Sequence, residues 1–228
     1  MNLKILISGV SGDLGKAIAL SLEDKYEVVG LYHRNKPEDL HKIQLVQVDF
    51  TNPETYQKTI SKMRGNLVYI HAAALSRDSL LIHEKSLNTK AALDVNLISA
   101  IEISKSLMPN MIKQNFGKFL FLSSVVATRP QIGASSYSIS KLGLNSLCKS
   151  ICVEYGNFGV RANILQLGYF NAGLGARLDE NKKNQLLKRI PLRRFGEIRD
   201  VVGAVNFIID NEYLSGSVIT LDGGFHVT

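Results

Sequence analysis

The sequence predicts a doubly wound α/β fold, in which helices cover both faces of a seven-stranded parallel sheet. Three observations lead to this prediction. Apolar runs of strand length alternate with stretches of helical periodicity along the whole chain. The predicted strands are rich in Val, Ile and Leu on both faces, as expected for a parallel sheet that is buried on both sides. The first of them runs directly into a glycine-rich turn and then a helix.

Each predicted strand is a short apolar run, and helical periodicity follows most of them without a Pro/Gly/Ser-rich linker. The strands are Leu3–Ser8, Glu27–Tyr32, Gln44–Val48, Leu67–His71, Lys118–Ser123, Arg161–Leu167 and Val218–Leu221. The helices are Leu14–Glu23, Pro53–Met63, a long one from about Lys85 to Met108, Tyr137–Tyr155, a charged pair between Leu174 and Arg189, and Asp200–Ile209. Right-handed crossovers then place a ligand at the carboxyl ends of the strands.

Length and composition fit one domain over residues 1–228. Apolar residues make up 45% of the chain and charged residues 21%, which excludes disordered, collagen-like and disulfide-scaffold classes. No apolar run is long enough to span a bilayer, so no membrane partner is expected. The start, MNLKILISGVSGDLG, resembles a strand and turn rather than a signal peptide, so a cytoplasmic protein is expected.

The net charge of +7 is concentrated in one late segment rather than spread along a stripe. Residues 174–200 hold eight basic side chains against four acidic ones, without interleaved aromatic residues. A nucleic-acid partner is therefore not expected. Two interpretations stay open: a solvated helical face, or a local field that attracts an anionic cofactor or substrate.

The glycine-rich turn after the first strand, Ser8 to Gly15, predicts a phosphate-binding loop. Gly9 allows the tight turn, Gly12 lets the backbone approach a pyrophosphate, and Gly15 permits close packing of helix on sheet. The following helix offers its N-terminal N–H groups to the anion. The context of strand, loop and helix predicts a dinucleotide site of the Rossmann type.

Cofactor choice is predicted from the end of the second strand, where an acidic residue would favour NAD. The strand ends Tyr32-His33-Arg34-Asn35, and Arg34 could bind a 2′-phosphate, which favours NADP(H) and leaves NAD(H) as the alternative. Arg34 could equally be a solvated loop residue. Asp49, after the third strand, could accept from the adenine amino group or cap the following turn.

Tyr137 and Lys141 are spaced i and i+4, so they share one face of a predicted helix. A neighbouring cation stabilises tyrosinate, so we expect a lowered pKa for Tyr137 and a role in proton transfer near neutral pH. Ser124 closes the fifth predicted strand, which places its hydroxyl at the same crevice.

With these motifs the chain resembles a short-chain dehydrogenase/reductase over nearly its whole length, from the Ser8 loop to the closing Asp222-Gly223-Gly224. The stretch Ile190 to Gly196 is most similar to the 3-oxoacyl-acyl-carrier-protein reductase branch. The resemblance implies that the serine polarises a carbonyl, the tyrosine transfers the proton, the lysine holds the nicotinamide ribose, and an asparagine helps to hold a water linked to the lysine. These catalytic residues fall on Asn96, Ser124, Tyr137 and Lys141.

Cofactor contacts are carried over by motif position, and no metal site is expected. They are Gly9, Ser11, Gly12, Asp13, Leu14, Gly15, His33, Arg34, Asp49, Phe50, Ala72, Ala73, Tyr137, Lys141 and Gly168.

Two departures from the family pattern bear on these contacts. Asp13 stands where the family usually has a second glycine, and its carboxylate would repel a pyrophosphate unless it points away. The sequence His71-Ala72-Ala73-Ala74 replaces Asn-Asn-Ala-Gly, with His71 interpreted as a structural substitute rather than a catalyst.

The expected function is an NADPH-dependent ketoreductase. Its substrate is a 3-oxoacyl thioester on a carrier protein or another small ketone, and residues 169–195 form a substrate lid. The alternative is a non-catalytic nucleotide-binding scaffold or regulator. The resemblance also implies a homo-oligomer, a tetramer or a dimer, assembled through the long helix from Lys85 and the helix from Tyr137.

Overall fold

The computed structural model describes residues 3–228, in which seven parallel strands form one sheet. The strands are β1 (Leu3–Ser8), β2 (Glu27–Tyr32), β3 (Gln44–Gln47), β4 (Asn66–His71), β5 (Gly117–Ser124), β6 (Val160–Leu167) and β7 (Val218–Leu221). Each agrees with its predicted range to within one residue at either end. Short apolar runs between turn residues are therefore a sufficient signal for the buried strands of this sheet.

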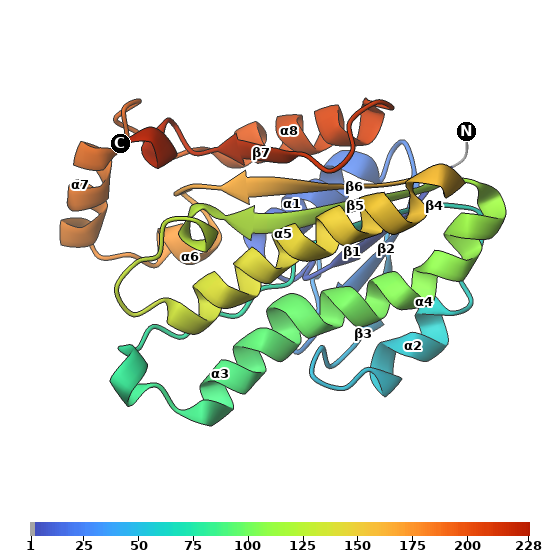
Figure 1. The fold of residues 1–228 in the computed structure, drawn as a ribbon, viewed down its shortest axis with the longest axis horizontal. Coiled ribbons are helices and arrows are strands. Elements are labelled where there is room, and N and C mark those ends of the chain that lie inside the picture. Colours follow the sequence, from blue (N-terminus) through green and yellow to red (C-terminus); the bar gives the residue numbers. More distant parts are fainter. Residues whose placement is uncertain (1–2) are drawn as a thin grey trace.

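The order of the strands across the sheet is β3-β2-β1-β4-β5-β6-β7. The chain starts in the middle at β1, builds outward through β2 and β3, and returns to β4 on the other side of β1 (Figure 1). The predicted doubly wound α/β fold is confirmed. The strand order reverses between β1 and β4, and a crevice at the carboxyl ends of such a pair is where this fold binds ligands.

The helices are α1 (Asp13–Leu22), α2 (Glu54–Ile60), α3 (Ser86–Leu93), α4 (Ser99–Gln114), α5 (Ser135–Tyr155), α6 (Gly173–Ala176), α7 (Glu180–Arg189) and α8 (Ile198–Asp210). The start of α8 lies two residues before its predicted position, because Glu197 and Asp200 form a reciprocal capping box there. Across residues 3–228, no helix has the length and apolar character needed to cross a bilayer.

Both faces of the sheet carry an apolar core, which explains strands without polar alternation. On one face, α1 lies beside α8 and covers a core that includes Ile5 and Ile7 of β1. On the other face, α2, α4 and α5 cover a core that includes Leu6, Tyr69 and Phe121 (Figure 1). Successive residues of one strand therefore enter opposite cores.

The long helix predicted from about Lys85 to Met108 differs from the prediction in two ways. A π-helical turn, Asp94–Ile98, separates α3 from α4. In addition, α4 continues through Pro109 to Gln114 and ends at Asn115 in the left-handed conformation, with φ 49°. Proline normally ends a helix. Here both Met108 and Met111 are buried in the core on either side of it, so tertiary packing outweighs the local preference.

The apolar residues of α5 divide into a buried set and an exposed set. Leu144 and Ile151 face the core, whereas Leu142 is 48% exposed and Val153 is 87% exposed. Burial within this chain therefore accounts for only part of the wide apolar arc. The predicted contact of this helix with a second copy of the chain stays a prediction.

The aromatic layer between the sheet and α4/α5 gives a test of the core. Phe121 is fully buried, stacks on Phe119 at 6.0 Å between ring centroids and meets Tyr69 edge to face. We expect Phe121→Ala to lower the free energy of unfolding by about 3–5 kcal/mol in urea titrations. The control is Phe158→Ala at a ring that is 38% exposed, where a much smaller loss is expected. Equal losses in both variants would contradict this assignment of the core.

Candidate active site

The turn after β1 requires glycine at two positions for steric reasons. Gly9 has φ 80°, and a Cβ there would lie 2.7 Å from the backbone nitrogen of Ala73. A Cβ on Gly15 would lie 2.3 Å from the carbonyl oxygen of Gly9. The loop is therefore pressed against the end of β4 on one side and against α1 on the other. This packing places the N-terminus of α1 directly over the switch point between β1 and β4.

Gly12 differs from the other two glycines because the protein itself does not fill the space beside it. A Cβ there would meet only the Gly9 carbonyl oxygen, at an ordinary 3.5 Å. Gly12 is also the N-cap residue of α1, and no side chain within residues 3–228 caps this helix end. The first-turn N–H groups of α1 therefore fit an anionic ligand that approaches along the backbone, such as the diphosphate of a dinucleotide.

The structure shows where the carboxylate of Asp13 points. Its Oδ2 accepts a hydrogen bond from the backbone N–H of Gly173 at 2.7 Å, across 160 positions of sequence. Gly173 begins α6 in the predicted lid. This hydrogen bond connects the nucleotide loop to the lid. Because Asp13 is the first residue of α1, its negative charge remains close to the N-terminus of that helix.

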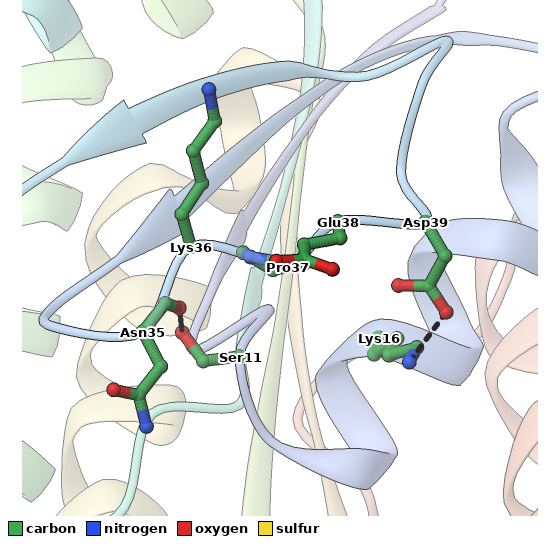
Figure 2. Close-up of a pocket in the computed structure, with 7 residues that line it drawn as sticks. All are labelled: Ser11, Lys16, Asn35, Lys36, Pro37, Glu38 and Asp39. Carbon is green, nitrogen blue, oxygen red and sulfur yellow. Dashed lines mark hydrogen bonds and ion pairs between the residues drawn. The ribbon is translucent and has the colours of Figure 1, made fainter.

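A cavity of about 420 Å³ lies beyond the end of β2, beside the nucleotide loop (Figure 2). Its lining residues are Ser11, Lys16, Asn35, Lys36, Pro37, Glu38 and Asp39. Ser11 Oγ donates to the Asn35 carbonyl at 2.8 Å, and Lys16 pairs with Asp39 at 2.5 Å. Figure 2 shows the Lys36 side chain extending away from Lys16. The sequence analysis did not identify Asn35 and Lys36, although they directly follow Arg34.

Asp49 caps its own turn, which is one of its two predicted roles. Its Oδ1 accepts from the Thr51 backbone at 2.9 Å and from the Thr51 hydroxyl at 2.8 Å. These hydrogen bonds hold the pKa of the Asp49 carboxyl below its usual range, and the charges of His33 and Arg34 act in the same direction. The two basic residues therefore lie close to Asp49. The adenine contact of Asp49 stays a prediction.

Other predicted cofactor residues have clear structural roles. Leu14 packs partly buried against the core on the α1 side, and Phe50 is buried in the core on the other face. At the end of β4, Ala72 donates its backbone N–H to the Ser8 carbonyl at 3.2 Å. Gly168 gives space to Asp222, the residue after β7, since a Cβ there would lie 2.5 Å from Asp222 Cβ.

Ser124 and Tyr137 both lie at the carboxyl edge of the sheet. Ser124 ends β5, and Tyr137 lies in the first turn of α5. Although the tyrosine is only partly buried, desolvation of the phenol raises the pKa of Tyr137 to about 12, and a hydrogen bond with Ser124 opposes this rise. The predicted lowering of this pKa is therefore not found, because desolvation outweighs the stabilisation of a tyrosinate.

Lys141 is only 2% exposed and is held by the backbone. Its Nζ donates to the Leu122 carbonyl at 2.8 Å and lies 5.7 Å from the centroid of the Tyr137 ring. Burial lowers the pKa of Lys141 to about 7. The structure thus brings the lysine and the tyrosine together, but in a setting where both groups are shifted toward their neutral forms.

Asn96 lies in the π-helical turn and contacts two other segments through its side chain. Its Oδ1 accepts from the Leu75 N–H at 2.6 Å, and its Nδ2 donates to the Leu75 carbonyl and to Ser140 Oγ, each at 2.9 Å. Leu75 follows β4, and Ser140 directly precedes Lys141. The side chain therefore holds α5 and the loop after β4. The predicted water link to the lysine stays a prediction.

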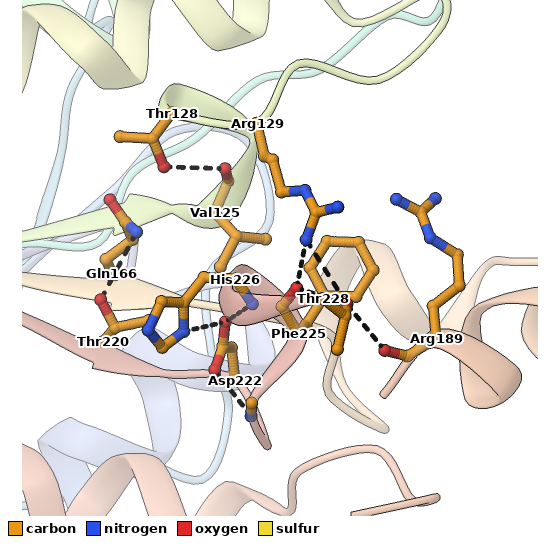
Figure 3. A network of polar contacts seen from close by, with 11 residues as sticks. Val125, Thr128, Arg129, Gln166, Arg189, Thr220, Asp222, Phe225, His226 and Thr228 are labelled. Atoms are coloured by element: carbon orange, nitrogen blue, oxygen red, sulfur yellow. Dashed lines mark hydrogen bonds and ion pairs between the residues drawn. The ribbon is translucent and has the colours of Figure 1, made fainter. Parts of the chain in front are cut away.

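The lid is anchored to the last residues of the chain. The Arg189 guanidinium at the end of α7 lies 4.8 Å from the centroid of the Phe225 ring, and that of Arg129 lies 5.2 Å from it (Figure 3). Arg129 also donates to the Phe225 carbonyl at 2.5 Å, and Thr228 Oγ1 donates to the Arg189 carbonyl at 3.1 Å. Arg129 thus contributes to holding this turn, a role that the sequence analysis did not foresee.

Sequence reasoning missed several buried polar residues of the site, among them Ser8, Tyr69 and Ser140. Tyr69 and His71 are two residues apart on β4, so their side chains point to the same face of the sheet. The Tyr69 hydroxyl and His71 Nδ1 each lie within hydrogen-bonding distance of the Ser8 hydroxyl and of one another. Two polar residues spaced i and i+2 in an otherwise apolar strand were the available signal. Within residues 3–228, no group of three or more His, Cys, Asp or Glu side chains is arranged to hold a metal ion.

Comparisons with known proteins agree with this geometry. Residues 9–226 match a family profile described as enoyl-(acyl carrier protein) reductase. A 3-oxoacyl-(acyl-carrier-protein) reductase of Buchnera aphidicola subsp. Baizongia pistaciae is 32% identical, over 97% of this chain and 96% of its own length. Carbonyl reductase family member 4 of Xenopus laevis is 29% identical, over 97% of each chain.

The fold also matches solved structures. A chain from Agrobacterium tumefaciens with bound NADP, assigned as a 2-deoxy-D-gluconate 3-dehydrogenase, superposes with a TM-score of 0.91. The match covers 99% of this chain and 96% of that one at 24% sequence identity, which establishes the shared fold. The profile match over nearly the whole chain and the 32% identical relative establish the family as well. This chain belongs to the short-chain dehydrogenase/reductase family of NAD(P)-dependent oxidoreductases.

Proposed function

We propose that this protein is an NADPH-dependent carbonyl reductase with Tyr137 as its proton donor. The observation that carries the proposal is the grouping of Ser124, Tyr137 and Lys141 at the carboxyl edge of the sheet, beside a glycine loop that fits a dinucleotide. A phenol with a pKa of about 12 is protonated at neutral pH, so it is ready to donate a proton. This protonation state suits the reduction of a carbonyl, and the ratio of reduced to oxidised cofactor sets the net direction.

In the proposed reaction the nicotinamide cofactor supplies a hydride to the carbonyl carbon when it is bound. The Ser124 hydroxyl donates a hydrogen bond to the carbonyl oxygen and stabilises the charge that develops there. Tyr137 transfers its phenolic proton to the same oxygen, so that the ketone becomes an alcohol. The electron pair of the broken C=O π bond accepts this proton, and the tyrosine is reprotonated from solvent.

Lys141 supports Tyr137 as the proton leaves. Its amine is anchored on the Leu122 carbonyl close to the tyrosine ring. Because the pKa of Lys141 is about 7, the lysine gains a proton at little cost when negative charge appears on the phenol. This arrangement supports proton transfer at neutral pH without a permanently lowered tyrosine pKa.

The preference for NADPH is proposed from the charges beyond β2. Arg34 and His33 lie near the end of this strand, and none of the four residues that directly follow it is the acidic residue that would favour the ribose hydroxyls of NAD. Lys16 and Lys36 line the adjacent cavity together with Glu38 and Asp39, and Lys16 is paired with Asp39 (Figure 2). The preference therefore rests on Arg34. A guanidinium recognises a phosphate through two parallel hydrogen bonds.

A 3-oxoacyl thioester is the proposed substrate class, because several relatives are named as 3-oxoacyl-(acyl-carrier-protein) reductases. Lys182 and Lys183 of α7 are paired with Asp78 and Glu180. Arg177 and Lys188, by contrast, are exposed basic residues of the lid and favour a substrate that carries negative charge. Leu186 and Ile190 are buried against Val125 and Phe225, which holds the lid beside the end of β5.

Replacing the proposed proton donor tests the reaction. We expect Tyr137→Phe to lower kcat for acetoacetyl-CoA by about 100- to 10,000-fold, because general acid catalysis is lost. The affinity for NADPH, measured by its fluorescence change, should stay within about threefold. The matched control is Tyr155→Phe at the other end of α5, which should retain activity.

The same assay separates the alternatives. Wild-type turnover of crotonyl-CoA but not of acetoacetyl-CoA would replace carbonyl reduction with reduction of a C=C bond, which the name of the family profile suggests. NADPH binding without turnover of any carbonyl compound would favour the scaffold function.

Cofactor preference gives a second test. Arg34→Ala should weaken NADPH binding by about 10- to 100-fold, since a hydrogen bond to a charged group contributes roughly 1.5–3 kcal/mol. NADH binding should hardly change, because it lacks the 2′-phosphate. Arg64→Ala, after α2, is the control. An unchanged ratio of NADPH to NADH affinity in the Arg34 variant would rule out the proposed phosphate contact.

The charge of Asp13 gives a third test. Asp13→Asn keeps an oxygen that can accept from Gly173 N–H and removes the carboxylate charge. We expect NADPH to bind roughly fivefold more tightly, because a like charge about 4 Å away in water costs on the order of 1 kcal/mol. The gain should shrink between about 0.05 M and about 0.5 M salt. A loss of affinity would show instead that the carboxylate assists cofactor binding.

A further inference from the structure

A buried polar network lies under the active site, between β1 and β4. Ser8 ends β1 and pairs in register with His71, which ends β4. The Ser8 hydroxyl lies 3.0 Å from His71 Nδ1, and the Tyr69 hydroxyl lies 2.8 Å from the same nitrogen. All three residues are fully buried. Each buried polar group therefore depends on the others for its hydrogen bonds.

The partners of the imidazole define its tautomer. His71 Nε2 lies 3.1 Å from the backbone carbonyl oxygen of Asn96. A carbonyl only accepts hydrogen bonds, so Nε2 carries the proton. In the neutral ring Nδ1 is then an acceptor, and the donors within reach are the Tyr69 hydroxyl at 2.8 Å and the Ser8 hydroxyl at 3.0 Å. Desolvation, together with the charge of Lys141, lowers the pKa of His71 to about 3, so the ring is neutral at physiological pH.

The carbonyl that His71 holds belongs to the π-helical turn between α3 and α4. A π turn is an insertion in a helix and is often found at functional sites. The side chain of Asn96 in this turn also binds Ser140, the residue that precedes Lys141 on α5. One imidazole therefore connects the strand that leads into the nucleotide loop with the helix that carries the proton donor.

We propose that His71 is a positioning residue for the reaction: its Nε2–H holds the Asn96 turn, and through Ser140 it holds α5 and Lys141 in place relative to the nucleotide loop. The proposal rests on the proposed function, because it takes the roles of Tyr137 and Lys141 from there. Tyr69 and Ser8 support this arrangement, since a hydroxyl that donates to Nδ1 keeps that nitrogen unprotonated and so keeps the proton on Nε2. A small shift of α5 would misplace the proton donor against the substrate carbon.

The first experiment measures the tautomer directly in the wild-type protein. Long-range 1H–15N spectra of the 15N-histidine protein report all five histidines, and His71→Leu identifies the signal of His71. We expect the Nε2–H pattern with no titration from about pH 5 to about pH 8. The titratable groups that face the ring are Tyr69 on β4 and Lys141 on α5. An Nδ1–H pattern, or titration near the ordinary value of 6.5, would overturn the proposal.

The second experiment compares two substitutions of His71 with different reach. The amide nitrogen of His71→Gln can occupy the place of Nε2 and donate to the Asn96 carbonyl, whereas His71→Leu fills similar space without a donor. We expect His71→Leu to lower kcat by up to about 100-fold, the loss that small misplacements of reacting groups produce. The KM for NADPH should change little, and His71→Gln should recover most of kcat. Equal effects of both variants, or a change in KM alone, would contradict a positioning role.

A third measurement needs no substrate, so its result does not depend on the proposed function. The 13Cε titration of Lys141 should have its wild-type midpoint in His71→Gln and a shifted midpoint in His71→Leu. Absence of turnover in the wild-type protein would defeat the proposed function, but these midpoints would still decide the positioning role. Unchanged midpoints in both variants would defeat it. If His71→Leu does not fold, His71→Asn takes its place, because its shorter amide can replace Nδ1 but cannot reach the Asn96 carbonyl, and a shifted Lys141 midpoint is the expected result.

Discussion

The close contact of Gly9 with the end of β4 is the constraint on which the rest of the site depends. A Cβ at Gly9 would lie 2.7 Å from the Ala73 backbone, and one at Gly15 would lie 2.3 Å from the Gly9 carbonyl oxygen. Only glycine lets β1, the loop and α1 pack this closely at the switch point of the sheet. The α1 N-terminus, the cavity beyond β2 and the edge that carries Ser124 are consequently neighbours, although they are distant in sequence.

Burial sets the electrostatics of the residues proposed for catalysis. Desolvation raises the pKa of Tyr137 to about 12 and lowers that of Lys141 to about 7, so each group is shifted toward its neutral form. A protonated phenol next to an amine that is ready to accept a proton suits the donation of a proton to a carbonyl. The same burial keeps His71 neutral, and its single N–H is directed to the turn of Asn96. The protonation states of Tyr137 and Lys141 and the hydrogen bond of His71 thus all depend on the exclusion of water from this region.

The segments that border the crevice are connected to each other by hydrogen bonds and cation–π contacts. Asp13 contacts the start of α6, and Arg129 and Arg189 flank Phe225 near the C-terminal end of the chain (Figure 3). The residues of α7 pack on the same apolar cluster as Phe225 and Val125. The position of the lid relative to Ser124 is therefore coupled to the C-terminal turn, and side chains that were candidates for substrate binding also have structural partners.

The sequence by itself determined the sheet, the glycine loop and the spacing of Tyr137 and Lys141, because these features depend on local periodicity and on steric rules that act over a few residues. The ends of the helices were predicted less accurately from the sequence. Pro109 lies inside α4, for example, because the packing of Met108 and Met111 in the core outweighs the tendency of proline to end a helix. Only the tertiary structure decided the direction of the Asp13 carboxylate, the π turn at Asn96 and the partners of His71. It also decided the pKa of Tyr137, because hydrogen bonds and desolvation depend on groups that approach from distant parts of the chain.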